Sequence, residues 1–344
     1  MIAEENMNAT IKLLKLLGSP FSPATTYMLD RIELMKLYRC SRKNRILFLY
    51  LETINKMNVE DFSTLYQEEK LRYLKTDDAI AKASRVLTDA HIKHSLFKTI
   101  RPYRSTTVDL DILIFGDRNC IKSVKAMQKA GYKIVVYGPR STTLWDKEAN
   151  IGIDLYEQVA VSFITYMDKQ KLISYVTTIM LPNGEYVKTL KPEANLACII
   201  AHSIIKEQMY TLSEYYTFIH YLKQMNINDF LKIVKQNNIA VATRTHATIT
   251  ALLHKTAHNT IPEKLQQILN SLGQETFETT LLIKKDFKTP HKYKLLTLVR
   301  SLLEIANVKK CRRSFAGQIL HMLGPRFTKD FLRDLMKHIL RETY

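Results

Sequence analysis

Residues 105–115, Ser-Thr-Thr-Val-Asp-Leu-Asp-Ile-Leu-Ile-Phe, read as a buried β-strand that carries two carboxylates. Successive side chains of a strand point to opposite faces, so Asp109 and Asp111 project from the same face. Two neighbouring carboxylates repel each other, and a divalent cation between them relieves that repulsion. Oxygen ligands of this kind suit Mg²⁺ or Mn²⁺. The alternative is a solvated strand end, but the apolar residues around the acids favour a covered strand and a metal site.

The pattern around this strand predicts three regions. Residues 1–75 show helical periodicity, residues 76–190 mix helix and strand, and residues 191–344 return to helix. Within the middle region we expect a helix that starts at an N-cap formed by Thr76 and runs to about Ala90. Strands are expected at 94–98, 109–115, 133–137, 141–145 and 151–156, with a hairpin of 177–181 and 185–189 on Pro182-Asn183-Gly184. The fold class is therefore α+β: a small mixed sheet flanked by N-terminal helices and a C-terminal helical bundle.

Composition indicates a folded cytoplasmic protein. Apolar residues make up 46% of the 344 residues, and there are only nine Gly and nine Pro. The four cysteines lie far apart in apolar or helical contexts, as reduced thiols do. The start of the chain does not resemble a signal peptide, and the longest apolar stretch, which contains His202, is too short to span a membrane.

A further acid strengthens the metal hypothesis. The alternating segment Ile151–Tyr156 places Asp154 inside a second strand. With Asp109, Asp111 and Asp154, the chain resembles the nucleotidyltransferase superfamily with the DNA polymerase β-like palm. It is most similar to the uncharacterised bacterial and archaeal nucleotidyltransferases with a helical C-terminal half. By that resemblance, the three aspartates are the catalytic metal ligands.

The resemblance also implies nucleotide-binding residues. Lys98 and Thr99 stand where the family usually has Gly-Ser, so the Thr99 hydroxyl would bind a terminal phosphate and Lys98 would add charge. Arg101 and Arg104 would pair with phosphate oxygens, the alternative being a solvated loop. His202 and Lys206 share one helix face. By resemblance, Lys206 would reach a phosphate and His202 the ribose or base, although His202 fits equally well as a core histidine.

The chemistry implied by the resemblance is nucleotidyl transfer. An acceptor attacks the α-phosphorus of a nucleoside triphosphate such as ATP, and pyrophosphate leaves. The metal ions would bind the triphosphate and activate the acceptor.

Charge favours RNA as the acceptor. The chain has 51 Lys and Arg against 33 Asp and Glu, a net charge of +18, and residues 284–344 alone carry +10. Polyanions are attracted by such an excess. We therefore expect RNA, with transfer RNA as a candidate, to contact Lys309, Lys310, Arg312 and Arg313 near the mouth of the palm. In the same segment, the amphipathic pattern of Leu295, Leu298, Val299, Leu302 and Leu303 predicts a helix that buries its apolar face on the bundle. The alternatives are a protein or small-molecule acceptor, and a non-catalytic nucleic-acid-binding protein that retains the palm as a scaffold.

Overall fold

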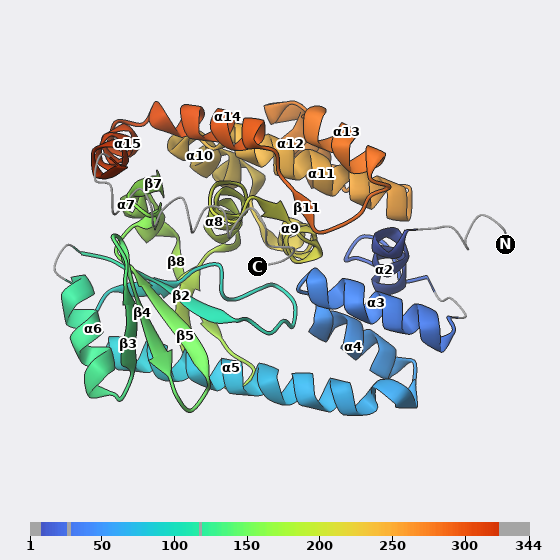
Figure 1. Ribbon diagram of the computed structural model, residues 1–344, viewed down its shortest axis with the longest axis horizontal. Helices are drawn as coiled ribbons and strands as arrows, with labels where there is room; N and C mark the ends of the chain where they lie inside the picture. The colour runs from blue at the N-terminus through green and yellow to red at the C-terminus, as the bar shows by residue number, and fades with distance from the viewer. Residues whose placement is uncertain (1–7, 26–28, 117–118, 323–344) are drawn as a thin grey trace.

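The structure is a computed structural model that describes residues 8–25, 29–116 and 119–322. It shows an α+β fold in which one mixed sheet lies between helices (Figure 1). The first group of helices comprises α2 (Ala9–Leu17), α3 (Arg31–Lys43), α4 (Leu47–Lys56) and α5 (Ser63–Asp89), with the short 3-10 helix η1 (Glu60–Phe62).

The middle region contains the sheet and its connections. Its strands are β1 (His94–Leu96), β2 (Asp109–Ile114), β3 (Lys133–Tyr137), β4 (Ser141–Asp146), β5 (Ile151–Tyr156), β8 (Val176–Met180) and β9 (Tyr186–Leu190). Between them lie α6 (Asn119–Lys129), the ribbon of β6 (Val159–Val161) and β7 (Ile164–Met167), α7 (Lys169–Leu172) and the 3-10 helix η2 (Ile173–Tyr175). The seven strands follow the order β3-β4-β5-β2-β1-β9-β8, with parallel pairs β2/β5 and β1/β9 and antiparallel pairs elsewhere.

The last group is helical. It comprises α8 (Pro192–Ile205), α9 (Leu212–Gln224), α10 (Ile227–Asn237), α11 (Ala240–His258), α12 (Glu263–Leu272), α13 (Phe277–Lys284), α14 (Leu295–Ala306) and α15 (Lys309–Met322), with the small pair β10 (Met209–Tyr210) and β11 (His291–Lys292). No helix among the described residues is long and apolar enough to cross a lipid bilayer.

Alternation along the strands places the acids. On β2, Leu110 and Ile112 pack into the core formed with α5 and α6, whereas Leu113 belongs to the core shared with α8. Since neighbouring side chains alternate, Asp109 and Asp111 lie on the α8 side of the sheet. The two cores therefore determine which face carries the carboxylates.

The expected start of a new helix at Thr76 is wrong. Helix α5 is continuous for 27 residues, and Thr76 lies inside it. The Thr76 hydroxyl donates to the carbonyl of Arg72 at 2.9 Å, so it bonds within the helix and does not cap a new one. No Gly or Pro interrupts this stretch, which runs below the sheet in Figure 1.

The N-terminal helices share a core with the last group. Leu13 and Leu14 of α2 belong to the same buried cluster as Phe218 of α9 and Ile249 of α11. The turn after α3 is also attached to α9, because the backbone N–H of Leu212 donates to the side-chain oxygen of Asn44 at 3.1 Å. This contact holds the turn between α3 and α4 against the start of α9.

The expected burial of the apolar face of α14 holds for only part of that face, since Leu298 and Leu302 are half-buried and pack against the core. Leu295 and Leu303 are 69% and 66% exposed, while Thr297, Ser301 and Ile305 are buried. The polar face is drawn inward because the Thr297 hydroxyl donates to the buried carboxylate of Glu278. Helix α14 therefore turns a face with both polar and apolar residues toward the core.

Candidate active site

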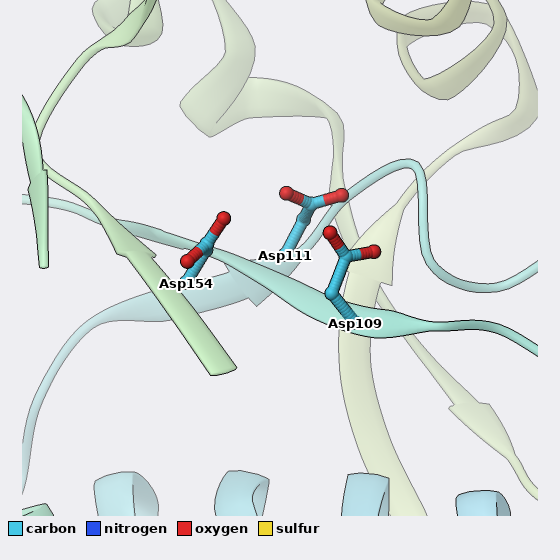
Figure 2. Close-up of side chains that lie close together, drawn as sticks. All are labelled: Asp109, Asp111 and Asp154. Atoms are coloured by element: carbon cyan, nitrogen blue, oxygen red, sulfur yellow. The ribbon is translucent and has the colours of Figure 1, made fainter. Parts of the chain in front are cut away.

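Three carboxylates converge on the α8 side of the sheet. Asp109 and Asp111 come from β2, and Asp154 comes from the parallel neighbour β5, where it pairs in register with Asp111. One carboxylate oxygen from each residue lies within 4.8 Å of the others, and Figure 2 shows the three groups on one side of the two strands. The structure therefore brings together the three acids expected from the sequence.

The acids fit divalent metal ions electrostatically. Burial and the charge of Asp111 raise the pKa of Asp109 to about 6. Burial also raises the pKa of Asp154, and the charge of Asp111 adds to this, although the Thr143 hydroxyl donates to its carboxylate and opposes the shift. Because crowded carboxylates with raised pKa values are stabilised by a nearby cation, this donor set suits Mg²⁺ or Mn²⁺.

Lys98 lies directly against the triad. Its Nζ is 3.2 Å from Oδ1 of Asp111 and 3.3 Å from Nδ1 of His202, and it also lies over the rings of Phe97 and Tyr156. Burial raises the pKa of Asp111, but the nearby ammonium groups of Lys98 and Lys206 together with His202 outweigh this and hold that pKa below its ordinary value. The backbone of Lys98 has φ 64°, a conformation that glycine adopts most easily. The lysine thus has a backbone conformation typical of glycine while its side chain reaches the acids.

Thr99 has a different contact from the one expected. Its hydroxyl accepts a hydrogen bond from the backbone N–H of Asp111 at 2.8 Å, and the side chain is buried. It does not line the cavity above the triad. Thr99 therefore positions the strand that carries Asp111.

His202 is a half-buried neutral histidine that also lines the cavity above the triad. Its Nδ1 faces the hydroxyl of Tyr166 at 3.0 Å as well as Lys98, and its Nε2 lies 3.1 Å from Oε1 of Glu207. Burial and the charge of Lys98 lower its pKa to about 3. Because Nδ1 faces two donors, the proton belongs on Nε2, directed at Glu207. Both ring nitrogens are therefore engaged by protein groups.

A cavity of about 340 Å³ opens above Asp109 and Asp111, and we call it the triad cavity. Its basic lining residues are Arg45, Lys98, Arg101 and Lys206. The guanidinium of Arg101 is held in place by a hydrogen bond from its Nη1 to the Thr217 hydroxyl at 3.1 Å. The Nζ of Lys206 lies 3.3 Å from the Tyr156 hydroxyl.

Other expected residues do not meet at this cavity. Arg104 pairs with Glu52 at 2.8 Å and lines a separate cavity. Arg312 and Arg313 are exposed on α15, and Arg313 lines another separate cavity with Arg140. The side chains of Lys309 and Lys310, and all of residues 323–344, lie outside the described part of the chain.

Two charged lining residues, Arg45 and Glu207, were missed by the sequence interpretation. Arg45 belongs to a dense basic run at 39–45. This run is the sequence signal that points to a basic surface outside the C-terminal segment. Glu214 forms a capping box with Thr211 at the start of α9 and also lines the triad cavity.

Comparisons with known proteins give a distant likeness. No family model matches the chain, and no curated protein matches it. Among solved structures, it is similar to an antigenic nucleotidyltransferase-like protein from Paracoccidioides brasiliensis, with 14% identity, a TM-score of 0.28, and coverage of 65% of this chain and 96% of that one. It is also similar to a STING-associated CdnE c-di-GMP synthase from Capnocytophaga granulosa, with 13% identity, a TM-score of 0.27, and coverage of 88% and 98%. Identities and TM-scores as low as these support no conclusion about function, which therefore has to come from the geometry of the site.

Proposed function

We propose that this protein is a nucleotidyltransferase that uses Mg²⁺ or Mn²⁺ to move a nucleoside monophosphate from a nucleoside triphosphate to an acceptor, RNA in the first instance. The observation that carries the proposal is the convergence of Asp109, Asp111 and Asp154, the first two of which line a cavity that also contains basic side chains. Transfer RNA is one candidate acceptor, and ATP is one candidate donor.

The three aspartates would hold the divalent ions. When bound there, these ions neutralise phosphate charge and lower the pKa of an attacking hydroxyl. Lys98, Arg101 and Lys206 line the same cavity, so they would pair with the oxygens of the triphosphate and keep the α-phosphorus in place.

Asp154 is the candidate for proton acceptance. Burial raises its pKa, which makes its carboxylate a better base than an exposed one. The acceptor oxygen would form a bond to the α-phosphorus while the bond to the β-phosphate oxygen breaks. The acceptor proton passes to Asp154, and pyrophosphate leaves through the open side of the cavity.

A second candidate is a non-catalytic nucleic-acid-binding protein that uses the palm as a scaffold. The observation that favours it is the Lys98–Asp111 ion pair, because the ammonium supplies a positive charge where a metal ion would otherwise be needed. This candidate predicts RNA binding without triphosphate-dependent modification and without specific Mn²⁺ binding.

The test is incubation of the protein with each α-labelled nucleoside triphosphate, Mg²⁺ or Mn²⁺, and total cellular RNA. Label that becomes attached to RNA, and is absent with the Asp111→Asn variant, supports the transferase. Label attached to protein or to a small molecule would replace RNA with that acceptor. RNA binding with no transfer to any acceptor would favour the scaffold.

A further inference from the structure

A second cavity of about 500 Å³ lies beside the triad cavity and carries most of the charge excess of this region. We call it the arginine trough. Its basic lining residues are Arg39, Arg42, Lys43, Arg45, Arg72 and Arg101. It lies between the C-terminal end of α3, the first half of α5 and the segment 105–108 that leads into β2.

Basic residues outnumber acidic ones in the lining of the trough. Glu69 is the one acid among the residues that line it, and this carboxylate already accepts from the Thr106 hydroxyl and lies 3.8 Å from Arg72. Arg39 and Arg42 are exposed, and they lie three residues apart on one face of α3. Cations gathered in a concave surface concentrate the electrostatic field and attract a polyanion.

The trough continues into the triad cavity. Arg45, Arg101, Thr107 and Val108 line both. The lining of the triad cavity itself holds four acids, Asp109, Asp111, Glu207 and Glu214, against four basic residues. The excess positive charge therefore lies in the trough, away from the place where the metal-bound triphosphate would lie.

The turn that carries Arg45 is held rigidly. Asn44 is fully buried, its side chain donates to the Thr289 carbonyl at 3.2 Å, and its carbonyl accepts from the backbone N–H of Ser213 at 3.1 Å. Arg45 has φ 59°, a strained conformation for a residue with a side chain. The strain is maintained by this network, which places the arginine at the junction of the two cavities.

Apolar surface in the trough fits nucleobases. Tyr38 and Leu47 line it together with the arginines, and both are half-buried. Alternation of cationic and aromatic groups is typical of sites that track a single-stranded backbone and stack its bases.

We propose that the arginine trough binds the phosphate backbone of the acceptor, a single-stranded RNA end whose terminal hydroxyl enters the triad cavity between Arg45 and Arg101. The role as acceptor site rests on the proposed transferase function, whereas the binding of RNA does not. The trough is lined by none of the residues of α15, and Figure 1 shows α3 and α15 on opposite sides of the view.

The experiment measures binding of a fluorescent RNA oligomer of about six nucleotides by anisotropy, without divalent ions. The full chain is compared with an Arg39→Gln/Arg42→Gln variant, an Arg39→Glu/Arg42→Glu variant and the matched control Arg312→Gln/Arg313→Gln. Because Arg39 and Arg42 are exposed, the melting temperature should be unchanged. We expect the neutral trough variant to bind about 10-fold more weakly at low salt with a shallower salt dependence, the charge-reversed variant to lose more, and the control to bind as wild type.

Equal affinities for wild type and both trough variants, or equal losses in the trough variant and the control, would overturn the proposal. So would a loss of triphosphate binding in the trough variants with RNA binding intact, since the trough would then belong to the donor. If RNA binding follows the expected pattern but no triphosphate supports transfer, the transferase function fails and the RNA site stands. If transfer occurs but the trough variants bind RNA normally, the proposed role of the trough fails and the transferase function stands.

Discussion

The ammonium of Lys98 lies 3.2 Å from the carboxylate of Asp111, and both side chains are buried. This ion pair compensates one of the three negative charges of the triad from within the chain. It also links the loop after β1 to β2, because Lys98 reaches the acid from a backbone conformation with φ 64°. Metal binding and Lys98 should therefore compete for the same carboxylate.

Replacing Lys98 by Met should tighten metal binding and weaken the metal-free fold. Loss of one partner of a buried ion pair typically costs about 3 kcal/mol, because the other charge remains buried without compensation. Mn²⁺ would then supply the missing charge. We expect a lower melting temperature without metal, a larger stabilisation by Mn²⁺ than in wild type, and tighter Mn²⁺ binding by calorimetry. The exposed Lys93→Met variant serves as the control. Weaker Mn²⁺ binding in Lys98→Met would show that the lysine does not compete with the metal.

Replacing Asp109 or Asp111 by Asn should abolish transfer and leave the fold intact. Loss of one preorganised charge at a reacting phosphate typically costs about 1,000-fold in rate. Single-turnover transfer of label measures this, with the exposed Asp89→Asn as the control. For Asp109, whose pKa burial raises to about 6, neutralisation should also raise the melting temperature at neutral pH without metal. Near-normal transfer in both variants would place the chemistry elsewhere.

Asp77 predicts a pH dependence of stability that is independent of metal. Burial raises its pKa from 3.8 to about 6, and one of its carboxylate oxygens has no hydrogen-bond partner. The folded state therefore binds its proton more tightly than the unfolded state does. This contribution to stability is fully present below about pH 4 and disappears as the pH rises through about 6. Asp77→Asn should raise the free energy of unfolding by about 2 kcal/mol at pH 8 and by little at pH 4. Urea unfolding at the two pH values measures it, and an equal gain at both would contradict the assignment.

The basic cluster on α15 predicts a contribution to binding of long RNA only. Replacing Lys309, Lys310, Arg312 and Arg313 by Gln should reduce affinity for an RNA of transfer RNA size. It should also make the salt dependence of binding shallower, because binding releases fewer counterions when fewer phosphates are contacted. Triphosphate binding should barely change. A salt titration of wild type and variant provides the measurement. Identical affinities and slopes would leave this charge as a solvated surface.

Local sequence patterns predicted the two strands that carry the three aspartates. The period of two along residues 109–114 requires that Asp109 and Asp111 share a face, and the same alternation in 151–156 sets the face of Asp154. The α+β class and the hairpin of β8 and β9 also follow from nearby residues, since turn chemistry and apolar periodicity act over short stretches.

The tertiary structure decided the surroundings of the triad. The contact of Lys98 with His202, the pairing of Arg104 with Glu52, and the position of Arg45 beside Asp109 join residues that are far apart in the chain. The continuity of α5 through Thr76 likewise depends on packing against the sheet, where the helix buries Ala79 and Ala83. No local period reports such contacts, because they arise only when distant elements bury their apolar faces together and bring their polar side chains into one cavity. The sequence by itself thus determined which carboxylates face the same way, and only the packing of the helices over the sheet decided which cations surround them.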